Sequence, residues 1–363
     1  MKIVTILGTR PEIIRLSLLT QKLDELADRH VVVHTGQNFD PALSDVFYKE
    51  LGLRLPDVWL RERNLSVGGQ LAASFAAVER VLERERPDRV LVLGDTNSAL
   101  CAVLAERMGV PVAHMEAGNR CFDLAVPEEK NRRVIDAVST FNLPYTEYSR
   151  QNLLREGFPA ARIFKTGNPI YEVLNRYRRQ IGASPILDRL GLKPGGYLLA
   201  TIHRAENVDH PARLAEIVRG LRLVAEQQGL RIVCSVHPRT RSMLSRLQEQ
   251  AAHPLIDFCE PFGFFDFVQL ERHARCVLTD SGTVQEECCI LQVPAVTVRE
   301  TTERPETVDC GSNTVCGVRA ERMAEAASAM ITLKGGWNCP EGYTDGNVSG
   351  KVAKFLLGGK TDV

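Results

Sequence analysis

Short runs of Val, Ile and Leu recur along this chain at the spacing of βαβ units, and they constrain its fold more than any other feature. Such runs predict strands at 3–7, 30–34, 89–93, 112–115, 197–202, 231–236, 276–279 and 295–298. Amphipathic stretches lie between them and predict helices, for example at 12–27, 66–84, 211–227 and 283–291. Strands that are apolar throughout are typical of sheets covered on both faces, so the alternation predicts an α/β protein with doubly wound parallel sheets.

A polar stretch near residues 167–195 interrupts this rhythm, and residues 167–174 within it are predicted as a turn. A chain of 363 residues is long enough for two cores. We therefore expect two doubly wound, Rossmann-like domains that face each other across a deep cleft. The expected ranges are an N-terminal domain at 1–168, a C-terminal domain at 190–346, and a C-terminal helix within 347–363 that packs back on the first domain.

The charges are balanced, with 45 Lys and Arg against 45 Asp and Glu. This balance argues against nucleic acid or an acidic membrane surface as the main partner, so any anion site must be local. No apolar run approaches the roughly 18–20 residues of a membrane span, and the N-terminus resembles a strand rather than a signal peptide.

The chain has ten cysteines but no CxxC pair, so no metal site is predicted. Cys101, Cys234, Cys276 and Cys288 have apolar sequence neighbours and are expected to be buried. This pattern indicates reduced thiols, as in a cytoplasmic protein.

Carboxylates gather after two predicted strands of the first half. Asp95 follows one strand, Glu116 follows the next, and Glu128 and Glu129 come soon after, among arginines between residues 120 and 133. Carboxylates that are crowded together raise each other's pKa and can then exchange protons near neutral pH. The pattern therefore predicts acid/base catalysis, and the alternative is a network of salt bridges with the arginines.

Two predicted strand-to-helix turns have the character of anion sites. In the first, residues 8–12 open a helix that carries Arg10 and Arg15. In the second, Ser281 and Gly282 open a helix, so that a phosphate can approach its N–H groups. Two further residues are predicted to contact the ligand there. Glu287 would accept hydrogen bonds from the ribose hydroxyls, and Arg304 would add positive charge to the anion site. The alternatives are an ordinary βα turn and a capped helix with surface charges.

Histidines follow two predicted strands of the second half. His203 and His237 lie at the carboxyl ends of these strands, where doubly wound folds bind ligands. Arg204 and Glu206 are close to His203 in the sequence. We expect both histidines in a binding or catalytic site; the alternative for each is a structural role.

Several motifs occur together and in a fixed order over nearly the whole chain. They are GTRPE, GDTNS, MEAGNR followed by PEEKNRR, TIHRAEN, DSGTVQEE and TTERPE. With these motifs the chain resembles the non-hydrolysing UDP-N-acetylglucosamine 2-epimerases. The resemblance implies a fold like that of GT-B glycosyltransferases, a UDP-sugar substrate, no cofactor and, usually, a homodimer. It also implies interconversion of UDP-N-acetylglucosamine and UDP-N-acetylmannosamine through 2-acetamidoglucal and UDP.

The resemblance also implies roles for individual residues. Those matching catalytic positions are Asp95, Glu116, Glu128 and His203. Those matching diphosphate contacts are Arg10, His203, His237, Ser281, Gly282 and Arg304, with Arg15 standing where many relatives carry Lys and Glu287 matching the ribose contact. Gln37 and Gln70 match part of an allosteric UDP-N-acetylglucosamine site known in some relatives, although the surrounding sequence differs.

Two departures from the family concern the sugar. The segment EAGNRCFDLAVPEE has a shorter loop than in many relatives, and SGT replaces the commoner SGG. Both are similar to the branch that forms UDP-N-acetyl-L-fucosamine from UDP-2-acetamido-2,6-dideoxy-L-talose, whereas TTERPETVDCGSN is similar to the general family. The N-acetylglucosamine substrate is therefore expected, with the 6-deoxy-L-talose sugar as the alternative.

Other classes of protein share parts of this pattern. A glycosyltransferase on the same fold would need the second-half nucleotide site, but it has less use for Asp95, Glu116 and Glu128 together. A hydrolysing epimerase is disfavoured by GTRPE and MEAGNR. A non-catalytic UDP-sugar sensor would tolerate loss of Asp95, and the presence of every expected ionisable group argues against it.

Overall fold

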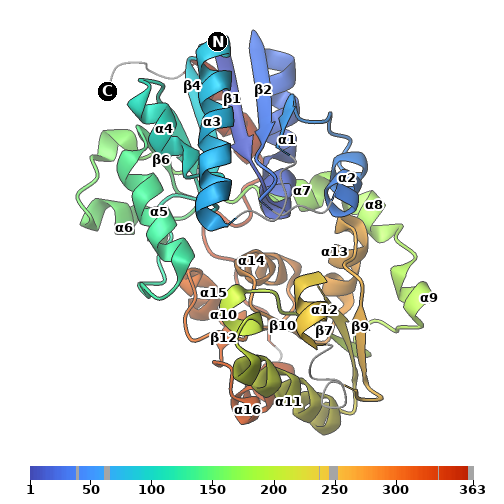
Figure 1. Ribbon diagram of the computed structural model, residues 1–363. Coiled ribbons are helices and arrows are strands. Elements are labelled where there is room, and N and C mark those ends of the chain that lie inside the picture. Colours follow the sequence, from blue (N-terminus) through green and yellow to red (C-terminus); the bar gives the residue numbers. More distant parts are fainter. Residues whose placement is uncertain (38–40, 61–65, 237, 245–251, 334, 359–363) are drawn as a thin grey trace. The chain divides into compact units, whose positions relative to one another are not determined.

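The chain forms two compact α/β units, each built on its own parallel sheet (Figure 1). The computed structural model describes residues 1–37, 41–60, 66–236, 238–244, 252–333 and 335–358. The first unit comprises Met1–Arg176 together with Glu341–Val363, and the second comprises Tyr177–Pro340.

The first unit contains a six-stranded sheet in the order β3-β2-β1-β4-β5-β6. Its elements are β1 (Lys2–Leu7), α1 (Arg10–Leu26), β2 (Arg29–His34), α2 (Pro41–Glu50), β3 (Val58–Trp59), α3 (Val67–Glu85), β4 (Arg89–Leu93), α4 (Cys101–Arg107), β5 (Val112–Met115), α5 (Pro127–Val138), β6 (Phe141–Leu143), α6 (Glu147–Arg155), a 3-10 turn (Ala160–Arg162), α7 (Ile170–Arg176) and α17 (Val348–Gly358).

Helices cover both faces of this sheet because its strands are apolar on both sides. On one face, Val4, Val31 and Val90 pack with α3, α4 and α5. On the other face, α1 contacts β1 and β2, and α17 packs on α1. The buried Arg89 donates to the carbonyls of Phe355 and Leu356 in the last turn of α17, where a cation is favoured by the helix dipole.

The second unit contains a six-stranded sheet in the order β12-β11-β10-β7-β8-β9. Its elements are α8 (Arg178–Gly182), α9 (Ile186–Leu190), β7 (Tyr197–Thr201), α10 (Ala205–Val208), α11 (Pro211–Gln228), β8 (Arg231–Ser235), α12 (Pro238–Leu244), β9 (Ile256–Cys259), α13 (Phe264–His273), β10 (Val277–Thr279), α14 (Gly282–Leu291), β11 (Ala295–Thr297), α15 (Pro305–Asp309), β12 (Asn313–Val315) and α16 (Ala320–Thr332). Here α11 and α16 pack on one face, and α9, α13 and α14 pack on the other.

The two sheets have the same strand order when each is numbered from its own first strand. In such a sheet the strands up to the third are added on one side of the first strand and those from the fourth on the other side. Ligands bind beyond the carboxyl ends of the strands at this switch point. The switch points are β1 next to β4 in the first unit and β7 next to β10 in the second. The doubly wound α/β architecture predicted from the sequence is thus confirmed.

One local prediction is wrong. Residues 167–174 were predicted as a turn, but helix α7 begins at Ile170. Before the helix the chain bends at Gly167, whose φ of 89° lies in the left-handed region. The side chain of Asn168 then accepts from the Ile170 amide at 3.1 Å, and Pro169 suits the start of a helix.

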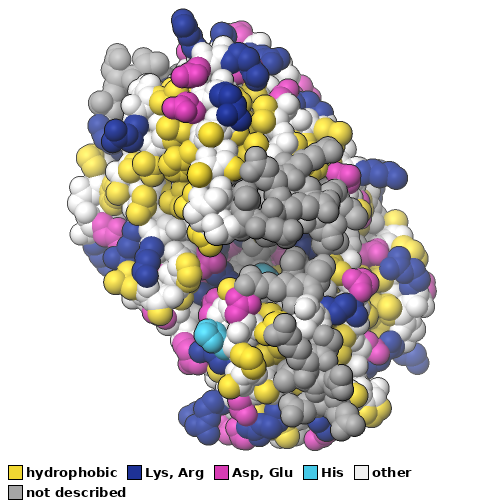
Figure 2. Space-filling model, in the orientation of Figure 1, with side chains coloured by type: hydrophobic (Ala, Val, Ile, Leu, Met, Phe, Trp, Pro, Cys, Tyr) yellow, Lys and Arg dark blue, Asp and Glu magenta, His cyan; other side chains and the backbone are white. Residues whose placement is uncertain are grey.

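The surface agrees with the balanced composition. Over the described residues of the face in Figure 2, basic and acidic side chains are interspersed. Within the described ranges, no helix has the length and apolar character needed to cross a membrane. Cys101, Cys234, Cys276 and Cys288 are buried and free, as predicted.

Candidate functional site

At the switch point of the first unit, Glu12 joins the two loops that follow β1 and β4. Its Oε2 accepts hydrogen bonds from the amides of Gly8 and Thr9 at 3.0 and 2.7 Å, and its Oε1 accepts from the Thr96 hydroxyl at 2.9 Å. Burial raises the pKa of Glu12 to about 7, although these hydrogen bonds oppose the shift. Glu12 lies within the GTRPE motif but was not itself predicted as a site residue.

Glu116 directly follows β5 and has an unusual backbone conformation. Its φ of 69° lies in the left-handed region, which is costly for a residue with a side chain. Its buried carboxylate forms an ion pair with Arg15 of α1. A Cβ added at Gly94 would lie 3.8 Å from Glu116 Oε1, so the carboxylate lies beside the turn that leads to Asp95.

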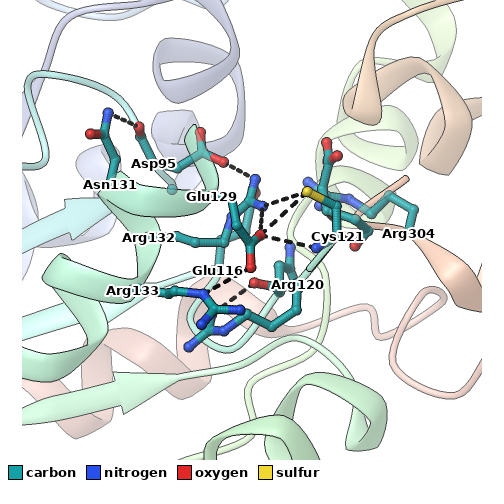
Figure 3. Close-up of polar contacts among 12 residues, drawn as sticks. Asp95, Glu116, Arg120, Cys121, Glu129, Asn131, Arg132, Arg133 and Arg304 are labelled. Atoms are coloured by element: carbon teal, nitrogen blue, oxygen red, sulfur yellow. Dashed lines mark hydrogen bonds and ion pairs between the residues drawn. The ribbon is translucent and has the colours of Figure 1, made fainter. Parts of the chain in front are cut away.

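Asp95 is held by helix α5 (Figure 3). Its carboxylate accepts from Arg132, and its carbonyl oxygen accepts from the Asn131 side chain at 2.9 Å. Its side chain remains 21% exposed. Asp95 is therefore fixed in position while part of its carboxylate is open to a ligand.

The two glutamates at the start of α5, Glu128 and Glu129, differ in burial. Glu128 is half-buried in the first turn, whereas Glu129 is fully buried and pairs with Arg132 and Arg133. Burial raises the pKa of Glu129, but the backbone hydrogen bond from Cys121 and the two ion pairs outweigh it and hold the pKa below its usual value. Glu129 thus stays ionised and orients Arg132 toward Asp95 (Figure 3).

The crowding of carboxylates expected from the sequence is therefore replaced by pairing with arginines. Each of the carboxylates Asp95, Glu116 and Glu129 has an arginine partner. The salt-bridge alternative correctly describes how the carboxylates are held. It does not exclude acid/base chemistry, because the paired carboxylates lie at the carboxyl edge of the sheet, where doubly wound folds bind ligands.

A buried network of hydrogen bonds and ion pairs around His114 holds the carboxyl edge of the first sheet. The His114 ring contacts the carbonyl oxygen of Gly94 at 2.8 Å through Nε2 and the carboxylate of Asp136 at 2.8 Å through Nδ1. These contacts join the turn after β4 to helix α5 through the imidazole ring. Asp136 also accepts from the Gly118 amide and pairs with Arg120. The one sequence signal for this network is a histidine within an otherwise apolar strand.

At the switch point of the second unit, Asp280 holds the loop that carries His203. The amides of His203 and Arg204 donate to its carboxylate at 3.1 and 2.9 Å, and the Asn207 side chain donates at 3.0 Å. The His203 side chain is 43% exposed, with Nδ1 3.4 Å from Asp280 Oδ1. The buried Asp280 therefore fixes the loop and leaves the imidazole accessible.

The start of α14 combines a helix N-terminus with a nearby arginine. Ser281 is the N-cap residue, and a Cβ added at Gly282 would lie 2.5 Å from Glu303 Oε1 and 3.5 Å from Arg304 Cζ. A side chain at this position would displace the Glu303 carboxylate, and the Arg304 guanidinium lies beside the helix start. Arg304 is buried and pairs with Glu286, which was not predicted as a site residue.

The remaining predicted residues have varied positions. Arg10 is half-buried at the start of α1, with its guanidinium carbon 5.9 Å from the ring centre of Phe47. Glu287 is buried in α14, and its charge contributes to raising the pKa of the buried Glu271 after the larger effect of burial. His237 lies outside the described residues.

Gln37 and Gln70 line one hollow in the first unit. Thr35, Gly36, Leu60, Ala73, Ser74 and Asn97 complete its wall. Asn97 belongs to the loop that carries Asp95, so the hollow adjoins that loop. The first unit thus brings Gln37 and Gln70 together in one hollow.

Polar residues therefore converge on the switch point of each unit. The residues at the switch point of the first unit are Arg15, Asp95 and Glu116. Those at the switch point of the second unit are His203, Ser281, Gly282 and Arg304. In the part of the chain that the structure describes, no group of three His, Cys, Asp or Glu residues is arranged to hold a metal ion. The arrangement suits proton transfer at the first point and anion binding at the second.

Comparisons with known proteins point to one family. A family model described as UDP-N-acetylglucosamine 2-epimerase matches residues 21–357. A UDP-N-acetylglucosamine 2-epimerase from Methanocaldococcus jannaschii is 38% identical, over 99% of this chain and 100% of that protein. A UDP-2,3-diacetamido-2,3-dideoxy-D-glucuronate 2-epimerase from Pseudomonas aeruginosa is 37% identical, over 98% of this chain and 99% of that protein.

The fold has the same relatives. A crystal structure of the M. jannaschii UDP-GlcNAc 2-epimerase in complex with UDP-GlcNAc and UDP matches this structure with a TM-score of 0.93 and 37% identity. The match covers 98% of this chain and 99% of that one.

Proposed function

The chain belongs to the UDP-N-acetylglucosamine 2-epimerase family and is an isomerase, and from this premise we propose that it interconverts UDP-N-acetylglucosamine and UDP-N-acetylmannosamine without releasing UDP. The observation that carries the proposal is the position of Glu116. Its strained backbone holds a carboxylate beside the Asp95 turn at the carboxyl edge of the first sheet.

The reaction requires proton transfer at C2 of the sugar. A base removes the C2 proton while the bond from C1 to the UDP oxygen breaks, which gives 2-acetamidoglucal and UDP. UDP then adds back to C1, and an acid delivers a proton to the other face of C2. Two proton-transfer groups are needed, and we assign them to Asp95 and Glu116, with Glu128 as a further ionisable group of this site.

The leaving UDP gains negative charge as the bond to C1 breaks, so its diphosphate must be held by cations and N–H donors. We assign this role in the second unit to Arg304, the α14 amides at Ser281 and Gly282, and the accessible imidazole of His203. The first unit would contribute Arg10, and Arg15 would act mainly through Glu116. Glu287 is proposed as the ribose contact and His237 as a further diphosphate contact.

The identity of the sugar is the finer part of the proposal. The Pseudomonas relative named for a diacetamido-glucuronate is nearly as similar as the Methanocaldococcus relative named for N-acetylglucosamine. The short loop before Pro127 supports a third possibility, the 6-deoxy-L-talose sugar. Reversal at C2 of a UDP-linked 2-acetamido sugar is common to all three, so the residue roles are the same in each case.

Two further elements of the proposal concern assembly and regulation. The hollow lined by Gln37 and Gln70 adjoins the loop of Asp95, which supports a regulatory UDP-sugar site there. We also propose a cytoplasmic homodimer, on the basis of the family resemblance.

Chromatographic separation of UDP-sugars tests the proposal. The purified protein is incubated with UDP-N-acetylglucosamine, and in parallel with UDP-N-acetylmannosamine. The same equilibrium mixture of the two is expected from both directions, without free UDP accumulating. Accumulation of UDP with free N-acetylmannosamine would instead identify a hydrolysing enzyme. Turnover of only the glucuronate or the 6-deoxy-L-talose sugar would reassign the substrate.

A further inference from the structure

Three cysteines lie together at the C-terminal end of α14, and the proposed reaction uses none of them. Cys289 is in the helix, Cys310 directly follows α15, and Cys339 lies beyond α16. The Sγ atoms of Cys289 and Cys310 are 3.7 Å apart, and Cys339 Sγ is 3.5 Å from the Cys289 carbonyl oxygen. This cluster of Cys289, Cys310 and Cys339 is referred to below as the thiol cluster.

The thiols in the cluster are chemically unequal. The hydrogen bond from the Cys289 thiol, with further hydrogen bonding at Ser312, lowers the pKa of Cys310 to about 6 against the effect of burial. A similar hydrogen bond lowers the pKa of Cys339 to about 7. The pKa of Cys289 is raised by the same contacts and by burial. Cys310 is half-buried, so a small oxidant can approach its thiolate. Cys289, its neighbour, remains a protonated thiol.

We propose that the thiol cluster is a redox-sensitive modification site, in which hydrogen peroxide converts Cys289 and Cys310 to a reversible disulfide. The Cys310 thiolate attacks one peroxide oxygen, the O–O bond breaks, and hydroxide leaves and takes up a proton, which gives a sulfenic acid and water. The Cys289 sulfur then attacks the Cys310 sulfur. The S–O bond breaks, and the hydroxide leaves with the Cys289 proton as a second water. Peroxide is the oxidant, and the two thiols supply both electrons.

The geometry requires only a local shift. A disulfide has an S–S distance of roughly 2 Å, so the two sulfurs must approach each other by less than about 2 Å from their present 3.7 Å. Cys289 lies near the end of α14, and Cys310 lies in the loop between α15 and β12. The disulfide would therefore draw the end of α15 toward α14.

Such a shift acts on the anion site, and this consequence rests on the proposed function. Arg304 immediately precedes α15, and its partner Glu286 lies one turn before Cys289 in α14. Movement of α15 against α14 would displace the Arg304 guanidinium from the helix start. Oxidation is expected to weaken UDP binding by on the order of tenfold.

Disulfide mapping of the full-length protein tests the modification independently of UDP. The protein is treated with hydrogen peroxide, free thiols are alkylated, and the digest is analysed without reduction by mass spectrometry. A peptide pair linked through Cys289 and Cys310, reversed by dithiothreitol and absent in Cys310→Ser and Cys310→Ala, is expected. A bond that involves Cys339 instead, or oxidation of Cys310 without a disulfide, would overturn the assignment.

A matched control and a binding measurement complete the test. Cys316→Ser is the control, because Cys316 is also half-buried but burial raises its pKa to about 12. This variant should form the disulfide like the unmodified sequence. Calorimetry with UDP should show weaker binding after oxidation and recovery after reduction. Unchanged affinity in the disulfide form would refute the coupling, whereas a reduced protein that does not bind UDP would refute the proposed function.

Discussion

Arg15, in the second turn of α1, forms a buried ion pair with Glu116, the residue that follows β5. The pair joins two residues that lie 101 positions apart in the chain. It also changes the expected role of Arg15, which the sequence assigned to the diphosphate. An arginine that holds a strained carboxylate in place is a positioning residue for the proton transfer that we assign to Glu116.

Glu116→Gln should lower kcat by roughly 10²- to 10⁴-fold, because a carboxamide cannot exchange the C2 proton. The affinity for UDP should change little, since Glu116 acts as the transition state forms. Steady-state kinetics and calorimetry measure the two quantities. Glu79→Gln, an exposed position on α3, serves as the control and should leave both unchanged. Near-normal turnover of Glu116→Gln would remove Glu116 from the mechanism.

The stability of the ion pair can be measured separately from catalysis. Arg15→Gln and Glu116→Gln should each lower the free energy of unfolding by roughly 3–5 kcal/mol, since each leaves a buried charge without its partner. The double variant should cost less than the sum of the two. Urea unfolding of the four proteins gives the coupling. Strict additivity would show that the two side chains do not interact in solution.

Glu12 should make the stability depend on pH. Its pKa is raised from 4.5 to about 7 by burial, so between these values the folded protein holds a proton that the unfolded chain has lost. The free energy of unfolding should therefore fall as pH rises through this window, by on the order of 3 kcal/mol from this group. The contribution is constant below about pH 4.5, where both states are protonated.

Glu12→Gln should remove this dependence, because an amide does not titrate. Its oxygen can accept from Gly8 and Thr9, and its nitrogen can donate to the Thr96 hydroxyl, so the loops keep their contacts. Urea unfolding at pH 5 and pH 7, with the exposed Glu83→Gln as a control, measures the difference. Equal pH slopes for Glu12→Gln and the unmodified sequence would contradict the assignment.

Arg304→Ala should weaken UDP binding by roughly 10- to 100-fold, as expected for loss of a charge-assisted hydrogen bond of about 1.5–3 kcal/mol. Arg219→Ala is the matched control, because Arg219 is exposed on α11 and forms ion pairs with Glu216 and Glu321, which the proposal does not use. Calorimetry with UDP distinguishes the two. Equal affinities for both variants would exclude Arg304 from the nucleotide site.

The parts of the fold that the sequence predicted are those buried on both sides. Every strand expected from an apolar run is present, with ends that differ by one residue at most. The strands that were missed are β3, β6, β9 and β12, and all of them are edge strands. Edge strands are short and carry polar residues, as in Asn313–Val315, so they lack the apolar run that reveals a central strand.

For the candidate site, the sequence revealed residues at strand ends but missed the residues that hold them in place. Motifs at the ends of central strands led to the prediction of Asp95, Glu116 and His203, and the structure places all three just beyond the carboxyl ends of such strands, because parallel strands end at one edge of a sheet. The residues that hold them were missed, namely Glu12, His114 and Asp280. Their function lies in contacts with distant backbone groups, as when His114 contacts the Gly94 carbonyl, and such partners cannot be read from local sequence.

The most direct test of the account is epimerisation in D2O followed by proton NMR. If Asp95 and Glu116 remove and return the C2 proton, UDP-N-acetylmannosamine formed from UDP-N-acetylglucosamine must carry deuterium at C2. The C2 proton signal of the product should be missing from the first turnover, while the other ring signals remain. A product that retains the original C2 proton would contradict deprotonation at C2 and with it the roles assigned to both carboxylates.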